Sequence, residues 1–216
     1  MSLIAGIDEA GRGCVIGPLV IVMFSCQSEN EPKINALCKK DSKQLSQKQR
    51  EIIFEQIKHL GKINFIELSA VMLNQLMKKE TLNEIEAMFI AKLVKNLNVD
   101  VSVKIDLPDR YSWVFAKRME RYGIKKYEAE HKADENHPIV AAASIIAKVL
   151  RDRKIEEIKN EVGDFGSGYP CDEKTITFLR NKENMKNMAK YIRKKWKTLE
   201  TIKQTKLFIR VLGFGV

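Results

Sequence analysis

The chain has 216 residues, of which 44% are hydrophobic and 31% charged, and its formal net charge is +10. This length suits one α/β domain with a sizeable core and a helical appendage, and no apolar run of about eighteen residues suggests a membrane span. The four cysteines occur singly, which argues against a zinc site and against a disulfide framework. Because no secretory signal precedes the first predicted strand, we expect a cytoplasmic protein that does not bind membranes.

The chain opens with uncharged residues, Leu3 to Ile7, which predict a buried strand. Asp8 and Glu9 follow at once, and carboxylates at the end of a buried strand are costly unless a cation offsets them. Next comes Gly11-Arg12-Gly13, where two glycines permit positive φ or close approach to a ligand around one guanidinium. The opening segment therefore indicates a ligand site, with an ordinary solvated turn as the alternative.

Hydrophobic spacing and turn residues divide the rest of the chain into strands and helices. Residues 19–24 predict a second strand, antiparallel to the first because the link between them is short and glycine-rich. Ser46 is an expected helix N-cap, and Ile52 and Ile57 are expected on the buried face of its helix. In chain order we further predict a polar loop over 27–35, helices over 47–60, 70–79, 81–97, 111–122 and 138–162, strands over 62–68, 101–105 and 125–130, and a glycine-rich loop over 163–168.

Carboxylates stand where two of these strands end and where the last long helix is about to begin. They are Asp8, Asp106 and Asp134. If the first and fourth strands are parallel neighbours, their carboxyl ends meet at one edge of the sheet, the usual place for α/β chemistry. Adding Glu9 gives four acids whose mutual repulsion is prohibitive unless divalent cations bind. Asp109 competes for the third position, and we favour Asp106 because it stands at the strand end.

Oxygen ligands without His or Cys favour Mg²⁺ or Mn²⁺ over zinc. Two such ions about 3.5–4 Å apart are the standard apparatus for phosphodiester hydrolysis. The sequence therefore predicts a two-metal nuclease site.

Positive charge is concentrated at the C-terminal end. Residues 181–216 contain ten Lys or Arg against two Glu, a net charge of +8, whereas the other residues together carry +2. Tyr191 and Trp196 are interleaved with the basic residues, as in nucleic-acid-binding surfaces, although a solvated helix face is the alternative. The lysines that we expect to contact nucleic acid are Lys194, Lys195 and Lys197.

The motif Asp8-Glu9-Ala10-Gly11-Arg12-Gly13 resembles the signature of type 2 ribonucleases H, the ribonuclease HII family. The His131-Lys132-Ala133-Asp134 motif and the basic C-terminal tail are more similar to archaeal than to bacterial members. Further motifs of that family follow in the same order, and the resemblance covers the chain from Leu3 to Leu207. These motifs are Asp41-Ser42-Lys43, Ile105-Asp106-Leu107-Pro108-Asp109, Glu130-His131-Lys132-Ala133-Asp134, the helix over 141–148, Gly166-Ser167-Gly168-Tyr169 and Lys195-Trp196-Lys197-Thr198.

The resemblance implies an α/β architecture, the ribonuclease H-like fold: a five-stranded mixed sheet in the order 3-2-1-4-5, flanked by helices. We expect residues 1–168 to form the catalytic domain and residues 169–216 a basic helical region packed on it. The resemblance also implies that Asp8, Glu9, Asp106 and Asp134 are catalytic metal ligands.

Substrate contacts are implied in the same way. The Gly11-Arg12-Gly13 backbone would contact the ribose 2′-hydroxyl, which distinguishes RNA from DNA. Tyr169 would stack on the sugar of the following deoxynucleotide, and Lys43 and Lys148 would hold phosphates. Without the resemblance, Tyr169 reads as a loop residue packed on the core and Lys148 as half of a surface ion pair.

The expected enzyme hydrolyses the RNA strand of RNA–DNA hybrids and cuts 5′ of single ribonucleotides in duplex DNA, in replication and ribonucleotide excision repair. The alternatives are another two-metal nuclease of this fold and a non-catalytic nucleic-acid-binding protein. We expect a monomer. Gln204-Thr205-Lys206-Leu207 matches the first half of a sliding-clamp-binding peptide, whereas Arg210 and Val211 stand where aromatic residues belong. The alternative is that this apolar tail packs on the domain.

Overall fold

The computed structural model describes residues 2–39, 42, 44–97 and 101–202. The chain divides into two compact units. Unit 1 comprises Met1–Ala10, Leu19–Glu67 and Glu80–Asp152, and unit 2 comprises Gly11–Pro18, Leu68–Lys79 and Arg153–Val216. Gly168 and Tyr169 both belong to unit 2. The domain boundary that we expect after residue 168 stays a prediction.

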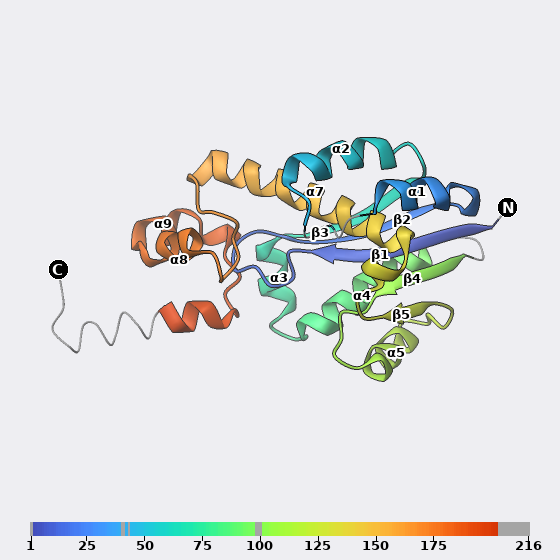
Figure 1. Ribbon diagram of the computed structural model, residues 1–216. Coiled ribbons are helices and arrows are strands. Elements are labelled where there is room, and N and C mark those ends of the chain that lie inside the picture. The colour runs from blue at the N-terminus through green and yellow to red at the C-terminus, as the bar shows by residue number, and fades with distance from the viewer. Residues whose placement is uncertain (1, 40–41, 43, 98–100, 203–216) are drawn as a thin grey trace. The chain divides into compact units, whose positions relative to one another are not determined.

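The sheet is mixed and five-stranded, in the order β3-β2-β1-β4-β5 (Figure 1). Strands β1 and β2 are antiparallel, whereas β4 is parallel both to β1 and to β5. The predicted fold class and the predicted antiparallel pair are therefore confirmed. The strands are β1 (Leu3–Ala10), β2 (Leu19–Gln27), β3 (Lys62–Leu68), β4 (Ser102–Asp106) and β5 (Glu128–Glu130).

Two strands are longer at their carboxyl ends than the sequence pattern predicts. β1 continues through Asp8 and Glu9 to Ala10, and β4 includes Asp106 as its last residue. An apolar run in the sequence predicts only the buried part of a strand. β1 extends beyond its apolar run because Asp8, Glu9 and Ala10 also pair with β2. The acids are thus held by strand backbone.

The polar loop expected over residues 27–35 is wrong. This segment forms a 3₁₀ turn, η1 (Ser28–Asn30), and a short helix, α1 (Glu31–Leu37). Pro32 stands in the first turn of α1, where its missing N–H costs nothing, and Ile34 is fully buried. A single buried side chain in an otherwise polar segment gives too weak a hydrophobic period to predict a helix.

Helices cover both faces of the sheet in unit 1 (Figure 1). α1, α2 and the first part of α7 pack on one face, where β2 contributes Val20, Val22 and Phe24 to the core, while α4 contacts β2 on the other face. The unit 1 helices beyond α1 are α2 (Gln47–Ile57), α4 (Leu82–Lys95), α5 (Ser112–Arg121), α6 (Ala133–Asn136) and α7 (Pro138–Val162), which ends in unit 2.

The start of α2 is a complete capping box. The Ser46 hydroxyl accepts from the Gln49 N–H at 3.3 Å, and the Gln49 side chain accepts from the Ser46 N–H at 2.8 Å. The N-cap prediction is confirmed. Ile57 is buried as expected, but Ile52 is 53% exposed, so its predicted place on the buried face is wrong.

Unit 2 is helical in the part expected to be helical and basic. Its elements include α3 (Ala70–Leu76), α8 (Glu173–Arg180), α9 (Lys182–Asn187) and the 3₁₀ turn η2 (Ala189–Tyr191). They enclose a small core of fully buried residues, including Ile16, Phe165, Leu179 and Met188. Ile16 comes from the segment after β1, so this core joins that early segment to the end of the chain.

Among the described residues, none of the helices has the length and hydropathy that a membrane span requires.

Helix α7 crosses β1 at a glycine. A Cβ on Gly6 would lie 2.3 Å from the carbonyl oxygen of Ile139 and 2.6 Å from the backbone nitrogen of Val140. Since these atoms belong to the backbone, no rotamer change relieves the clash. Close contact between helix and strand at this point therefore requires glycine.

We expect Gly6→Ala to lower the free energy of unfolding by about 3 kcal/mol or more, measured by urea titration. Gly123→Ala is the control, because Gly123 has φ 76° and no neighbouring atom within 4 Å of a built Cβ. It should cost only about 1–2 kcal/mol of backbone strain. Equal losses in the two variants would contradict the close packing.

Candidate active site

The two acids at the ends of β1 and β4 lie beside each other in unit 1. Ile7 pairs with Ile105 in the parallel ladder, so Asp8 and Asp106 follow in register. Asp8 is 5% exposed. Burial and the neighbouring charge of Asp106 raise the pKa of Asp8 to about 7. The expectation that β1 and β4 bring their carboxyl ends together is confirmed.

Helix α7 supplies polar partners to Asp8. Ser144 hydrogen-bonds to its carboxylate, and the positive charge of Lys148 opposes the rise in its pKa. The Lys148 ammonium donates to the hydroxyls of Ser144 and Ser42, at 2.6 Å each. Lys148 therefore lies beside the Asp8 carboxylate, and its role on phosphate stays a prediction.

A turn brings the third acid toward the same edge. The N–H of Ala133 donates to the Asp106 carboxylate at 2.9 Å, and Asp134 follows in the short helix α6. Lys132, just before, has a left-handed backbone with φ 60°, which is rare for a residue with a side chain. The strained turn ties Asp134 to the end of β4, and such strain clusters at functional sites.

Glu9 leaves the sheet on the other side. Asp8 pairs with Val22, which belongs to the core under α7, and the side chains of neighbouring strand residues point to opposite faces. Within the described residues, no three His, Cys, Asp or Glu side chains gather closely enough to hold a metal ion. The four-acid ligand set stays a prediction, and Asp8 with Asp106 is the pair that the structure brings together.

This pair fits a hard divalent cation. Asp8 is buried and Asp106 is partly buried, and burial together with the neighbouring Asp106 charge raises the pKa of Asp8. A divalent cation offsets these charges, and oxygen donors select Mg²⁺ or Mn²⁺. Asp8 and Asp106 would hold the ion, with Glu9 and Asp134 as the further expected ligands.

Asp109 has a different task. It is 4% exposed, its carboxylate binds Arg118 at 2.9 Å, and Asn83 donates to its other oxygen. Arg118 also binds the buried Glu84 at 2.8 Å. Asp109 thus belongs to a network that joins α4 to α5, which leaves Asp106 as the acid of β4.

The Gly11-Arg12-Gly13 loop belongs to unit 2. Gly11 has φ 85°, so its conformation favours glycine, and its carbonyl accepts from the Cys14 thiol at 2.8 Å. The Tyr169 ring lies beside Gly13, 3.9 Å from where a Cβ on that glycine would be. The structure thus brings together Tyr169 and the glycine loop, two motifs more than 150 residues apart in sequence.

The loop that carries Tyr169 is tightly bonded. Gly168 accepts hydrogen bonds from Val15 N–H at 2.9 Å and from Ile16 N–H at 3.2 Å. Asp172, the N-cap of α8, accepts from Ser167 N–H and hydroxyl at 2.6 and 2.7 Å. These bonds, the backbone one first, lower the pKa of Asp172 to about 2. Their stabilisation is complete above about pH 4 and is lost as the pH falls toward 2.

Sequence reasoning missed the residue that fixes the glycine loop. Arg193 is fully buried and donates to the carbonyls of Gly17 at 2.9 Å and Arg12 at 3.0 Å. Its guanidinium also lies 4.9 Å from the Trp196 ring centre, and Trp196 donates to the Gly13 carbonyl at 3.3 Å. The sequence could not single out Arg193 within the basic segment, because a buried arginine and a solvated one have the same charge.

Several other predicted contacts lie elsewhere or outside the described residues. Lys194, Lys195 and Lys197 are exposed, and the Lys195 ammonium donates to the Met77 carbonyl. Their role on nucleic acid stays a prediction. Lys43 and the segment 204–211 lie outside the described residues.

Comparison with known proteins agrees with this geometry. The family model for ribonuclease HII matches residues 5–199. Ribonuclease HII of Archaeoglobus fulgidus is 40% identical over 203 residues, which are 94% of this chain and 98% of that protein. The structure of the PCNA:RNase HII complex from Archaeoglobus fulgidus superposes with a TM-score of 0.83 at 40% identity, covering 92% of this chain and 95% of that one. The ribonuclease H2 of Pyrococcus horikoshii OT3 gives 0.82 at 35% identity, covering 94% and 98%.

The sheet order, with acids on neighbouring parallel strands, is that of the ribonuclease H-like fold, which both solved relatives share. Within that class, the chain belongs to the ribonuclease HII family. It is a ribonuclease H enzyme, from a metal-dependent family of endonucleases that act on RNA strands.

We expect Asp106→Asn to abolish cleavage of an RNA–DNA hybrid without loss of stability, because it removes a carboxylate from a repulsive pair. Asp109→Asn is the matched variant. It should lower the free energy of unfolding by about 3 kcal/mol, because it breaks a buried ion pair, and should cleave normally below its melting temperature. Gel assays and thermal melts check both expectations. Cleavage lost in Asp109→Asn and kept in Asp106→Asn would reverse the assignment.

Trp196→Phe keeps a ring over Arg193 and removes the N–H that binds Gly13. Losing one hydrogen bond of about 1 kcal/mol should speed amide exchange over residues 11–18 about fivefold. Exchange in β2 serves as the internal control and should not change. Hydrogen exchange read by mass spectrometry makes the measurement, and unchanged exchange over 11–18 would show that Trp196 does not hold the loop.

Proposed function

We propose that the protein is an endonuclease that hydrolyses the RNA strand of RNA–DNA hybrids and cuts 5′ of single ribonucleotides in duplex DNA, leaving 3′-hydroxyl and 5′-phosphate ends. The observation that carries the proposal is the buried Asp8 carboxylate beside Asp106, on neighbouring parallel strands. Replication and ribonucleotide excision repair are the processes in which such substrates arise, and a cytoplasmic enzyme would meet them.

In this proposal the metal site holds two Mg²⁺ or Mn²⁺ ions, with Asp8, Glu9, Asp106 and Asp134 as ligands. When bound, the ions activate the attacking water and stabilise the leaving oxygen. The protein's part is to hold the acids. Backbone pairing fixes Asp8 and Asp106, and the Ala133 N–H fixes the orientation of the Asp106 carboxylate. Lys148, which is held by Ser42 and Ser144, is suited to neutralise a phosphate.

Recognition of the ribonucleotide is assigned to unit 2. The Gly11-Arg12-Gly13 backbone would contact the 2′-hydroxyl, and Tyr169 would stack on the following deoxyribose. In support, the carbonyls of Arg12 and Gly13 are taken by Arg193 and Trp196, which fixes the peptide planes of the loop. The proximity of the Tyr169 ring to Gly13 supports reading of two successive sugars.

A duplex DNA that carries one ribonucleotide tests the proposal directly. With Mg²⁺ or Mn²⁺, the wild-type protein should cut once, 5′ of the ribonucleotide, and the all-DNA duplex should stay intact. Asp8→Asn should lose cleavage by a factor of at least about 1,000 and, in EDTA at pH 8, should melt at a higher temperature because a buried charge is gone. No cleavage of the one-ribonucleotide duplex by wild type would refute the proposal, as would near-normal turnover by Asp8→Asn.

We also propose that the C-terminal tail binds a sliding clamp. A relative that is 40% identical forms a PCNA:RNase HII complex, and Gln204 and Leu207 match the start of a clamp-binding peptide. The peptide would present its apolar side chains to a groove on the clamp.

A synthetic peptide of residues 200–216, titrated against the cognate clamp by calorimetry, should bind with a micromolar dissociation constant. Gln204→Ala and Leu207→Ala in the peptide should each weaken binding about tenfold. The same peptide in scrambled order is the control. No binding at several hundred micromolar would exclude this tail as the clamp contact.

A further inference from the structure

An exposed aromatic surface follows β4 in unit 1. Tyr111 and Trp113, at the start of α5, are 50% and 61% exposed. Their rings are stacked, with centres 6.4 Å apart and planes inclined by 23°. Exposed aromatic rings that stand together in this way mark a candidate interaction surface.

A cation lies over the face of each ring. The Arg110 guanidinium carbon lies 5.2 Å from the centre of the Tyr111 ring, and the Lys117 ammonium lies 5.1 Å from the centre of the Trp113 ring. Aromatic faces beside mobile cations are the elements from which proteins build stacking sites for nucleobases with adjacent phosphate contacts.

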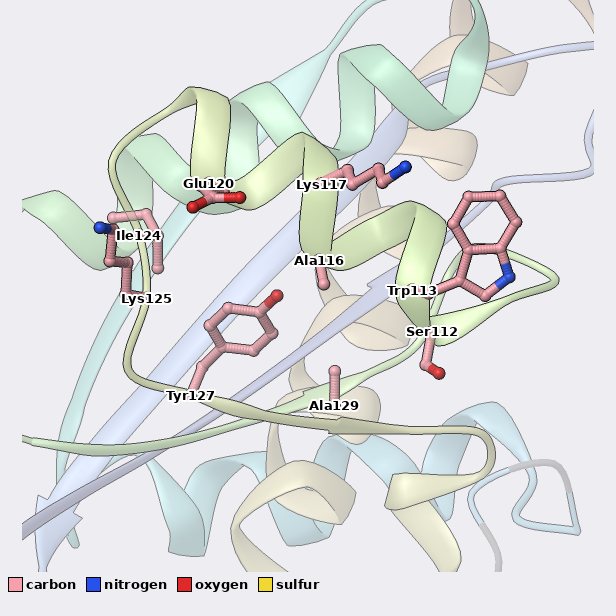
Figure 2. Close-up of a pocket in the computed structure, with 9 residues that line it drawn as sticks. All are labelled: Ser112, Trp113, Ala116, Lys117, Glu120, Ile124, Lys125, Tyr127 and Ala129. Carbon is pink, nitrogen blue, oxygen red and sulfur yellow. The ribbon is translucent and has the colours of Figure 1, made fainter.

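A hollow of about 540 Å³ lies next to Trp113, between α5 and the segment that leads into β5 (Figure 2). In Figure 2 the indole stands at one end of the hollow, and the Tyr127 hydroxyl points into it from the opposite segment. Lys117 and Lys125 are among its lining residues, with Glu120 as the acid. The hollow is large enough for a base and is more basic than acidic.

Two contacts hold residues of this surface in place. The Tyr127 ring packs edge-on against the fully buried Phe115 of α5, with ring centres 5.9 Å apart. The His131 ring hydrogen-bonds to the Arg110 carbonyl at 3.2 Å. These contacts hold Tyr127 and the Arg110 backbone in place, which reduces the entropic cost of binding.

We propose that this surface, formed by Arg110, Tyr111, Trp113, Lys117, Lys125 and Tyr127, binds single-stranded nucleic acid. One base stacks on the Trp113 indole, and the Lys117 ammonium, displaced from the ring, pairs with the neighbouring phosphate. Arg110 and Lys125 extend the positive charge along the strand.

Two features favour a single strand over other partners. Stacking on an exposed ring needs a base with a free face, and bases inside a duplex have none. The lining has two cations, Lys117 and Lys125, against the one acid Glu120. Arg110 adds a further cation beside Tyr111, so a polyanion is complemented. The proposal does not rest on cleavage, because binding needs no metal.

The test is binding of a fluorescein-labelled twelve-nucleotide oligo(dT), measured by anisotropy in EDTA. Trp113→Ala should weaken binding about tenfold through loss of one stacked base. Phe65→Ala is the matched control, because Phe65 is 50% exposed on β3 and lines none of this hollow. It should bind within twofold of wild type.

Lys117→Gln gives a second readout. It should lower the slope of log affinity against log salt by about 0.7, as expected for one phosphate contact on a single strand. Equal affinity in wild type, Trp113→Ala and Phe65→Ala would overturn the proposal and leave the surface to a protein partner. A Trp113→Ala variant that cleaves hybrids normally but has lost oligo(dT) binding would support it, whereas loss of cleavage alone would bear on the proposed function.

Discussion

The structure depends on holding two like charges together, one of which, Asp8, is buried. Asp8 and Asp106 are brought into register by parallel pairing of β1 with β4, and neither can move without breaking strand hydrogen bonds. α7 lies close to β1 because Gly6 has no side chain, and this closeness puts Ser144 and Lys148 within reach of Asp8. The fold therefore maintains a repulsion that a bound cation relieves, and the core of unit 1 supplies the energy.

Unit 2 fixes the conformation of a short backbone segment, the glycine loop after β1. The loop after β1 has few side chains with which to hold itself, so its carbonyls are bonded from outside by Arg193 and Trp196. Its other partner, the loop before α8, is fixed in turn by Asp172. The acids Asp8 and Glu9 and the backbone of the glycine loop thus come from one continuous sequence motif. The acids are supported by the packing of unit 1, and the loop is supported by the packing of unit 2.

Apolar runs and the short connection after β1 predicted the five strands and the antiparallel pair of β1 and β2. The strand order, by contrast, was implied by the resemblance to the ribonuclease HII family. The α1 segment escaped prediction, since Ile34 is its one fully buried side chain. The strand end favoured Asp106 over Asp109, but the ion-pair network of Asp109 escaped prediction, because only the three-dimensional structure shows the approach of Arg118 and Asn83. Arg193 was counted among the surface charges, since sequence does not reveal burial at that position. The metal-ligand roles of all four acids remain predictions, and the structure shows that Asp8 and Asp106 lie beside each other.

The bonds from Arg193 to Gly17 and Arg12 join positions that are 176 and 181 residues apart. During synthesis, β1 and β2 emerge early and can pair at once, whereas the loop between them waits for nearly the whole chain. At about 5–20 residues per second, that interval lasts on the order of ten to forty seconds. A nascent chain would thus have its first hairpin long before its glycine loop is set, so premature termination before residue 193 yields a protein with an unsupported loop.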